Sequence, residues 1–274
     1  MMIHFYLLQK EACPMTMLHT FKTIHLEDKN GVITLSLNRP ESHNSMNVEM
    51  LQELSSAMEV IKDSTAKIVL LKGNGPVFSA GGDIKMMLQD DSELFEEVMD
   101  SITNIVLTLY TMPKITISAL HGAAAGLGLS LALASDYVYA HPSTKIAMNF
   151  IKIGLIPDGA GHFFLKNRIG ETKAKHLIWK GQTITGAVAK DLLIVDEVKQ
   201  DLEEAISIKL EQLKTSPLQA MMETKSIYTS DSSEVLKTIL QLEKEGQRKM
   251  RQTEDHQEGI KSFLEKRVPN FKGE

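Results

Sequence analysis

Cysteine is almost absent from the sequence: Cys13 is the only one among 274 residues. That count excludes an intrachain disulfide framework and a cysteine-cluster metal site, and it makes a reduced, cytoplasmic setting the expectation. No apolar run reaches the ~18 residues that a membrane span needs, so no membrane partner is expected. The chain also has no excess of basic over acidic residues. Lys and Arg are dispersed and the net charge is -5, which argues against a nucleic-acid partner.

Histidines in ligand spacing are also lacking. His4, His19 and His25 follow no spacing typical of metal ligands, so no metal site is expected. What the chain does contain is an ordinary globular composition, with 43% hydrophobic and 24% charged residues. Its 274 residues allow one large domain, or a domain with an appendage, and an ample core.

The amino-terminal residues carry a short apolar run at 3–8 with no basic residue before it. A secretory signal has a positive start, a longer apolar stretch and a small-residue cleavage site. We therefore expect residues 1–16 to be an extension outside the fold, with Met17 as a candidate start. The rest of the chain divides by its texture into a core at 17–213 and a helical region at 214–274.

The core opens with a hairpin signal. Residues 21–27 and 32–38 are rich in β-formers, and Asn30-Gly31 closes the gap between them. Asn47 is then expected to cap a helix. A buried strand is predicted over 67–72.

A repeated pattern of strand, small-residue turn and helix follows. It occurs around Gly82 and again around Gly126, which indicates an α/β fold with parallel strands. Ligands of such folds lie beyond the carboxyl ends of the strands, where both turns are expected. Beyond Thr185 the chain reads as helical apart from a short strand at 194–198, and we interpret the charged segment 243–251 as a solvated helix face.

The glycine-rich loop at 77–85 is the strongest local feature. Gly81 and Gly82 have no Cβ, so the backbone is free to take unusual conformations and a ligand can come close. Asp83 is well placed to cap the following helix. A loop of exposed amide donors at a helix start suits an anion or a developing oxyanion. A plain strand-to-helix turn capped by Asp83 is the alternative.

Taken together, five segments in order resemble the crotonase (enoyl-CoA hydratase/isomerase) superfamily, from Leu18 to the carboxyl terminus. They are Asn38-Arg39-Pro40 with Asn44, Phe78 to Lys85, His121 to Asp136, Lys152 to Gly161, and Phe263 to Phe271. The resemblance implies a ββα superhelix, a helical C-terminal trimerisation region and an acyl-CoA substrate. It also implies a homotrimer or a dimer of trimers. No resident cofactor is implied, because coenzyme A enters as part of the substrate.

The resemblance also implies roles for individual residues. The backbone N–H groups of Gly82 and Leu127 match the family's oxyanion hole, which stabilises a thioester enolate. Positions matching contacts to coenzyme A are Ser42, Ala80, Gly82, Ile84, Phe263 and Lys266. The last two often come from a neighbouring subunit in this family.

The sequence departs from the family where hydratases carry two glutamates. Ser130 and Phe150 stand at those positions, so the usual pair for activating water is missing. Asp158 is the acid that remains near the expected site, and several isomerases of the family use an acid there as their single acid/base. The motifs are most similar to the phenylacetate-pathway and Δ3,Δ2-enoyl-CoA isomerase branch. Isomerisation needs one base, and a buried carboxylate with a raised pKa suits it.

Other interpretations remain open from the sequence. Asp158 is also a reasonable turn residue or helix cap. The segment 128–132 is close to a nucleophile elbow with Ser130 as nucleophile, typical of a serine hydrolase. A hydratase with a non-standard acid/base, or a non-catalytic acyl-CoA-binding partner subunit, are further alternatives. Candidates for an acyl pocket, or for core, are Met86, Met87, Met148, Phe150, Phe163 and Phe164.

Overall fold

The computed structural model describes residues 16–17, 20–87 and 91–274. Its larger sheet has the strand order β1-β2-β3-β4-β5-β7-β10, and a small sheet has the order β6-β8-β9. The strands are β1 (Thr16–Met17), β2 (Ile24–Lys29), β3 (Val32–Leu37), β4 (Ile68–Gly73), β5 (Ile115–Leu120), β6 (Ala123–Ala125), β7 (Tyr137–Ala140), β8 (Lys145–Ala147), β9 (Thr183–Thr185) and β10 (Glu197–Val198).

Helices surround these sheets. The α-helices are α1 (Val48–Asp63), α2 (Ile84–Met87), α3 (Ser92–Thr111), α4 (Leu127–Leu133), α5 (Gly161–Ile169), α6 (Glu171–Lys180), α7 (Gly186–Asp191), α8 (Leu202–Lys214), α9 (Leu218–Arg251) and α10 (Glu254–Leu264). Two short 3-10 helices, η1 (Pro40–Ser42) and η2 (Phe150–Ile153), lie in the connections. None of the helices in the described part of the chain is long and apolar enough to cross a bilayer.

The predicted hairpin is confirmed. Strands β2 and β3 pair antiparallel, and both turn residues have left-handed backbones, with φ of 55° at Asn30 and 74° at Gly31. Such a pair matches the twist of the flanking strands. The cap at Asn47 is confirmed as well, because its side chain accepts a hydrogen bond from the Met50 N–H. The predicted extension at 1–16 lies outside the described residues except for Thr16, which pairs with Asp28.

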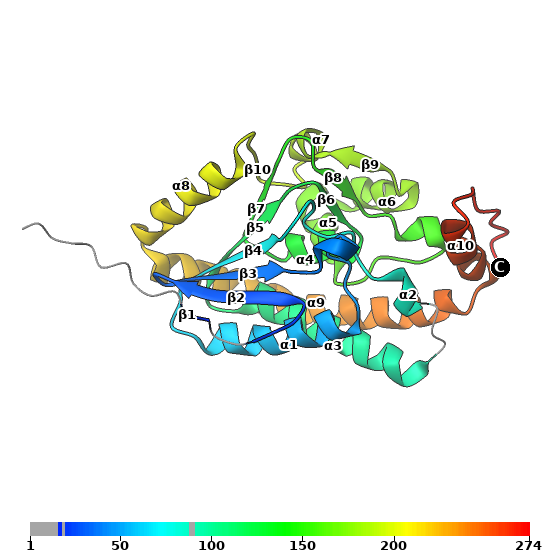
Figure 1. Cartoon of the computed structure of the whole chain (residues 1–274), viewed down its shortest axis with the longest axis horizontal. Coiled ribbons are helices and arrows are strands. Elements are labelled where there is room, and N and C mark those ends of the chain that lie inside the picture. Colours follow the sequence, from blue (N-terminus) through cyan, green and yellow to red (C-terminus); the bar gives the residue numbers. More distant parts are fainter. Residues whose placement is uncertain (1–15, 18–19, 88–90) are drawn as a thin grey trace, which may run out of the picture.

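The central strands of the large sheet are parallel and buried on both faces. From β3 through β4, β5 and β7 to β10 every neighbouring pair is parallel, as the repeated strand–turn–helix pattern predicts. Side chains of β4 alternate between two cores: Val69 and Leu71 pack with α1 and α3, whereas Ile68 and Leu70 pack with α8. Figure 1 shows α1, α3 and α9 together along one side of the sheet.

The small sheet was not predicted. Residues 121–128 read as a loop in the sequence, but β6 lies within them and pairs parallel with β8, which pairs antiparallel with β9. Each of these strands is only three residues long, too short for a hydrophobic period to show. The strand predicted at 194–198 is shortened to Glu197–Val198.

Helix α9 is 34 residues long and runs from the end of the molecule near α8 to the end near α10 (Figure 1). The break before it falls at Pro217, a residue that cannot continue a helix from its amino-terminal side. Leu236 and Leu240 of α9 join the main core, so this helix packs on the core of its own chain.

Candidate active site

The first glycine loop is tied to the second by backbone hydrogen bonds. The Ser79 N–H donates to the Ala123 carbonyl and the Ala125 N–H donates to the Ser79 carbonyl, each at 3.0 Å. Gly81 has φ of 99°, and a Cβ there would lie 2.7 Å from the Ala125 carbonyl oxygen. Gly81 therefore gives the loop its conformation and lets the two loops touch.

Two backbone N–H groups stay unpaired where these loops meet. Gly82 forms a parallel bridge with Met46, but that bridge uses the Gly81 carbonyl and the Asp83 N–H. Leu127 begins α4, where the first N–H groups have no partner inside the helix. Within the described residues neither the Gly82 nor the Leu127 N–H donates a hydrogen bond. Both amides are therefore free to bind an external oxygen.

The Asp83 carboxylate is held on both oxygens beside Gly82. Its Oδ1 accepts from the Lys85 N–H at 3.1 Å, which confirms the predicted cap of α2. Its Oδ2 forms an ion pair with Arg39 Nη1 at 3.2 Å, and both side chains are largely buried. The sequence analysis did not find this ion pair, because the partners are separated by 44 residues. Asp83 thus fixes the loop and is not free for proton transfer.

Asp158 lies in a turn that packs directly on α4. A Cβ at Gly159 would lie 2.7 Å from the Leu127 side chain, so glycine is needed for this approach. The Ser130 hydroxyl donates to the Asp158 carbonyl at 2.7 Å. The turn that contains Asp158 therefore packs on the first turns of α4, where Leu127 and Ser130 lie.

The Asp158 carboxyl is in a poor environment for a negative charge. Its side chain is 7% exposed, and Oδ1 is buried without a hydrogen-bond partner in the described part of the chain. Oδ2 accepts one long bond, 3.4 Å from Gln247 Nε2. Burial, followed by the neighbouring charge of Glu243, raises the pKa of Asp158 well above its ordinary value. A carboxyl with such a pKa suits proton transfer near neutral pH.

Two residues of α9 complete this cluster, and the sequence analysis missed both. The prediction that 243–251 is a solvated face is wrong for Glu243 and Gln247, which are 2% and 3% exposed. Glu243 accepts from the Ala160 N–H at 2.7 Å and from the His162 N–H at 3.1 Å, and it contacts His162 Nδ1 at 2.7 Å. A signal was present: the buried stripe of Leu236 and Leu240 continues with helical spacing through these two polar residues.

Ser130 and Phe150 bring no acid to the site. Ser130 is fully buried inside α4 and donates to a backbone carbonyl, so the nucleophile-elbow interpretation is wrong. Phe150 lies in η2, with its ring carbons 3.6 Å from where a Cβ of Gly126 would be. An apolar ring therefore stands beside the second loop. No cluster of three His, Cys, Asp or Glu side chains suited to a metal ion occurs among the described residues.

The residues matched to coenzyme A fall into two groups. Ser42, Ala80, Gly82 and Ile84 lie around the first loop, where the Ala80 N–H donates to the His43 carbonyl at 2.9 Å. Phe263, 56% exposed, lies near the end of α10, and Lys266 follows α10. No hydrogen bond or ion pair among the residues described joins these two to the loops.

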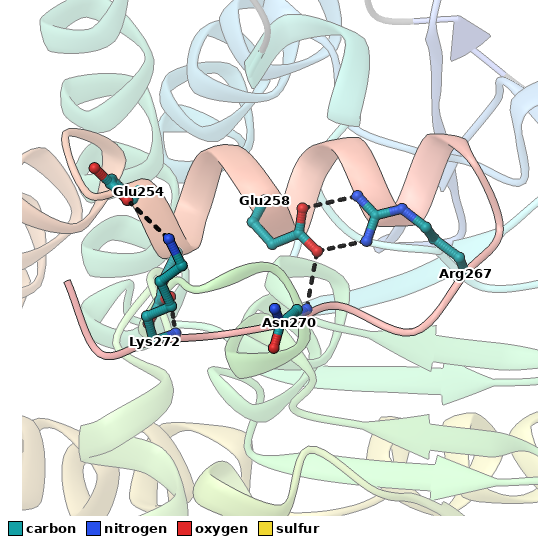
Figure 2. A pocket seen from close by; sticks show the side chains of 6 residues that line it. Glu254, Glu258, Arg267, Asn270 and Lys272 are labelled. Carbon is teal, nitrogen blue, oxygen red and sulfur yellow. Dashed lines mark hydrogen bonds and ion pairs between the residues drawn. The ribbon is translucent and has the colours of Figure 1, made fainter.

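The chain after α10 folds back along that helix and encloses a charged pocket of about 330 Å³ (Figure 2). Arg267 binds both carboxylate oxygens of Glu258, which also accepts from the Asn270 N–H. The Arg267 bond, above all, lowers the pKa of Glu258 to about 2. These contacts hold the segment that carries Lys266 and Phe271 in one position.

A small apolar cavity of about 10 Å³ lies next to Leu127. That volume is about the size of one water molecule. Its walls come from α1, α3, α4 and the segment before α1, and are formed by Met46, Leu51, Leu54, Ile102, Ile105, Val106, Leu127 and Leu131. Of the residues suggested for an acyl pocket, Met148, Phe150, Phe163 and Phe164 are part of the core, Met86 packs against it, and the side chain of Met87 lies outside the description.

The sequence and the fold are similar to those of known proteins. The family model described as enoyl-CoA hydratase/isomerase matches residues 27–274. The Bacillus subtilis protein YhaR, whose name carries the same description, is 51% identical and covers 88% of this chain and 96% of its own. The Escherichia coli 1,2-epoxyphenylacetyl-CoA isomerase is 35% identical, covering 91% of this chain and 97% of its own.

A further relative and one solved structure add to this. The Streptococcus mutans trans-2-decenoyl-acyl-carrier-protein isomerase is 32% identical over 92% of this chain and 99% of its own. The crystal structure of an enoyl-CoA hydratase from Mycobacterium avium subsp. paratuberculosis matches with a TM-score of 0.85 at 28% identity. That match covers 92% of this chain and all of the other.

Proposed function

The chain belongs to the enoyl-CoA hydratase/isomerase family, and on that basis we propose that it shifts the double bond of an enoyl-CoA thioester, with Asp158 as acid/base. The crotonase-like α/β fold and the acyl-CoA-processing class agree with the sequence prediction. The choice of isomerisation is the further step. It depends on which acids the site contains.

The observation that carries this proposal is the buried, poorly paired carboxyl of Asp158 in the turn that packs on α4. Gly159, the residue after Asp158, packs against the Leu127 side chain, and Asp158 Oδ1 has no partner among the described residues. Hydration by a carboxylate pair needs a second acid, but Ser130 and Phe150 stand at the positions where one is expected. Isomerisation needs only one group, which removes a proton and returns it.

In the proposed reaction the Asp158 carboxylate takes a proton from C2 of a 3-enoyl thioester. The electron pair left behind is delocalised over C2, the double bond at C3 and C4, and the thioester oxygen. The free N–H groups of Gly82 and Leu127 stabilise that oxygen, each by about 3 kcal/mol. Protonated Asp158 then delivers the same proton to C4, which leaves a double bond between C2 and C3. Atoms and electrons balance without another reactant.

The test is Asp158→Asn with a panel of cis- and trans-3-enoyl-CoA substrates, resolving products by double-bond position. Because the proton carrier is lost, kcat falls by at least ~100-fold. The Kd of a saturated acyl-CoA stays within about twofold of the wild-type value, because the uncharged amide is nearly isosteric with the carboxyl it replaces. Retained turnover would remove Asp158 from the mechanism.

Two other outcomes would replace the proposal. Wild-type protein that hydrates 2-enoyl-CoA without isomerising 3-enoyl-CoA would be a hydratase with a non-standard acid/base. Wild-type protein that binds acyl-CoA but converts none of the panel would be a non-catalytic partner subunit. The panel also decides between aliphatic and aromatic acyl groups, which the relatives' names leave open.

We further propose a cytoplasmic homotrimer or dimer of trimers. Exposed apolar side chains at Phe263, Leu264 and Val268 support an interface formed by the carboxyl-terminal segment. Light scattering on the purified protein tests the assembly, and a monomeric mass would contradict it.

A further inference from the structure

Helix α9 reaches the Asp158 turn with its carboxyl-terminal third. We propose that Glu243 and Gln247 are positioning residues for Asp158: Glu243 holds the turn and adds a negative charge beside it, and Gln247 orients the carboxyl. This inference rests on the proposed role of Asp158 as acid/base. Neither α9 residue is assigned a contact with substrate, so both act through Asp158.

Glu243 serves as the amino-terminal cap of α5. The residue before α5, Ala160, has a left-handed backbone with φ of 62° and provides no side-chain cap. Glu243 takes over that function from another helix, because its carboxylate accepts the N–H groups of Ala160 and His162. A negative charge at a helix start is favourable. The turn between Asp158 and α5 is therefore fastened to α9.

Gln247 lies four residues further along α9 and hydrogen-bonds the loop that contains Asp158. Its Nε2 donates to the Ile156 carbonyl at 2.6 Å and to Asp158 Oδ2 at 3.4 Å. Gly246 lets α9 come this close, since a Cβ there would clash with Ile156 Cδ1. With Oδ2 held by Gln247, the unpartnered Oδ1 is the oxygen left to exchange a proton.

The charged groups near this carboxyl are few. Glu243 is the charge that acts on Asp158, and His162 of α5 in turn pairs with Glu243. Helix α4 contributes only the neutral Ser130. His256 of α10 faces the start of the turn, where its ring bonds the Ile153 carbonyl.

The other charges of this part of α9 point away from the turn. Lys244 and Arg248 pair with Glu96 of α3, and Lys244 also pairs with Asp100. Glu243 has three donors around it, whereas Asp158 has one distant donor. Hydrogen bonds to a carboxylate favour its charged form. Asp158 is thus the member of the pair that binds a proton first as the pH falls.

These contacts predict opposite changes in the pH profile of kcat. Glu243→Gln removes a negative charge near Asp158, which lowers the pKa of Asp158. The acidic limb of the kcat profile therefore moves to lower pH by about one unit. Gln247→Leu removes the only donor to the Asp158 carboxyl in the described structure, so the acidic limb moves up and kcat falls roughly tenfold. KM changes little in both variants, because neither side chain is expected at the substrate.

His162→Gln is the variant least disturbing to the fold, because this side chain is 37% exposed. It removes the imidazole contact to the Glu243 carboxylate, so that carboxylate is less well stabilised and the acidic limb of the profile moves to higher pH. Glu245→Gln is the matched control: it removes the same charge two residues away, where Glu245 accepts from Gln241 and, among the residues described, from no other side chain. That control keeps the wild-type profile.

The outcomes separate the two levels of the proposal. If Asp158→Asn retains activity, the proposed function fails. If Asp158→Asn is inactive while Glu243→Gln, Gln247→Leu and His162→Gln keep the wild-type midpoint, only the positioning role fails. Loss of kcat at an unchanged midpoint would indicate a merely structural role and overturn the inference. Thermal unfolding of each variant identifies any that does not fold. In that case the pH profile of His162→Gln decides whether the positioning role holds.

Discussion

Near its amino end helix α9 places Lys225 against Asp136, and about five turns later it places Glu243 and Gln247 against the Asp158 turn. The first cluster joins opposite charges. Lys225 Nζ donates to Asp136 Oδ2 and to the Lys114 carbonyl, each at 2.9 Å. Asp136 Oδ2 also accepts from the backbone and hydroxyl of Thr116. Every charge there has a partner.

The second cluster brings two carboxyls together and leaves one oxygen of Asp158 unpaired among the described residues. Complete pairing lowers the free energy of the folded state, whereas an unpaired buried oxygen raises it. The same helix thus supports one cluster that stabilises the fold and one whose strained electrostatics suit proton transfer. Variants at each cluster test this contrast.

The largest effect on stability is expected from Lys225→Met. This substitution leaves the partly buried Asp136 without its cation, which costs about 3 kcal/mol of unfolding free energy. Urea denaturation measures the loss. Activity per folded molecule stays at the wild-type level, because the cluster lies far along α9 from Asp158. Unchanged stability would show that the ion pair contributes nothing, and lost activity would contradict the division between the clusters.

Asp158→Asn is expected to change stability by less, and in the opposite direction. The folded-state pKa of Asp158 is raised above its ordinary value of 3.8, so the folded state binds the proton more tightly than the unfolded state. The stability contribution is full below 3.8 and is lost as the pH rises through the raised pKa.

The variant removes that loss, so at neutral pH it is more stable than wild type by about 1 kcal/mol or more. The difference is measured by comparing the denaturation midpoints of the two proteins from about pH 3 to about pH 8, roughly the range over which a carboxyl with a raised pKa titrates. A wild-type protein whose stability does not fall relative to the variant as pH rises would show that Asp158 is not buried as a costly charge.

The smallest effect is expected on the outer face of α9. Glu96 pairs with Lys244 and Arg248 there, and these bonds lower its pKa. Glu96 and Arg248 are exposed, and the largely buried Lys244 keeps Asp100 as a partner. Glu96→Gln therefore changes Tm by no more than about 2 °C and leaves the pH profile of kcat unchanged. A large fall in Tm would place this pair with the Lys225 cluster. A shifted pH profile would mean that charges on both faces of α9 act on Asp158.

Features that depend on neighbours in the chain could be predicted from the sequence. The Asn30-Gly31 turn, the Asn47 cap and the alternation around Gly82 and Gly126 all follow from local backbone preferences. The three-residue strands of the small sheet could not be predicted, because their stability comes from pairing and not from their own residues.

The candidate site residues were found in another way. Gly82, Leu127 and Asp158 were matched through the family resemblance of the segments that contain them, and their roles stay predictions. Glu243 was missed, because a charged residue in a charged segment is usually exposed, and its burial depends on a turn more than 80 positions earlier, whose His162 N–H it accepts. That the pKa of Asp158 is raised could not be derived from the sequence, because its largest cause is burial and its second is the charge of Glu243 on that distant helix.

Leu127 contributes to the molecule in two independent ways, through its backbone N–H and through its side chain. Its backbone N–H is free at the loop, while its side chain forms part of the apolar cavity with Met46 and Ile102. Any residue except proline supplies that N–H, so substitutions here change the shape of the cavity without removing the amide. A position of this kind lets the apolar lining vary over evolutionary time while the backbone donor persists.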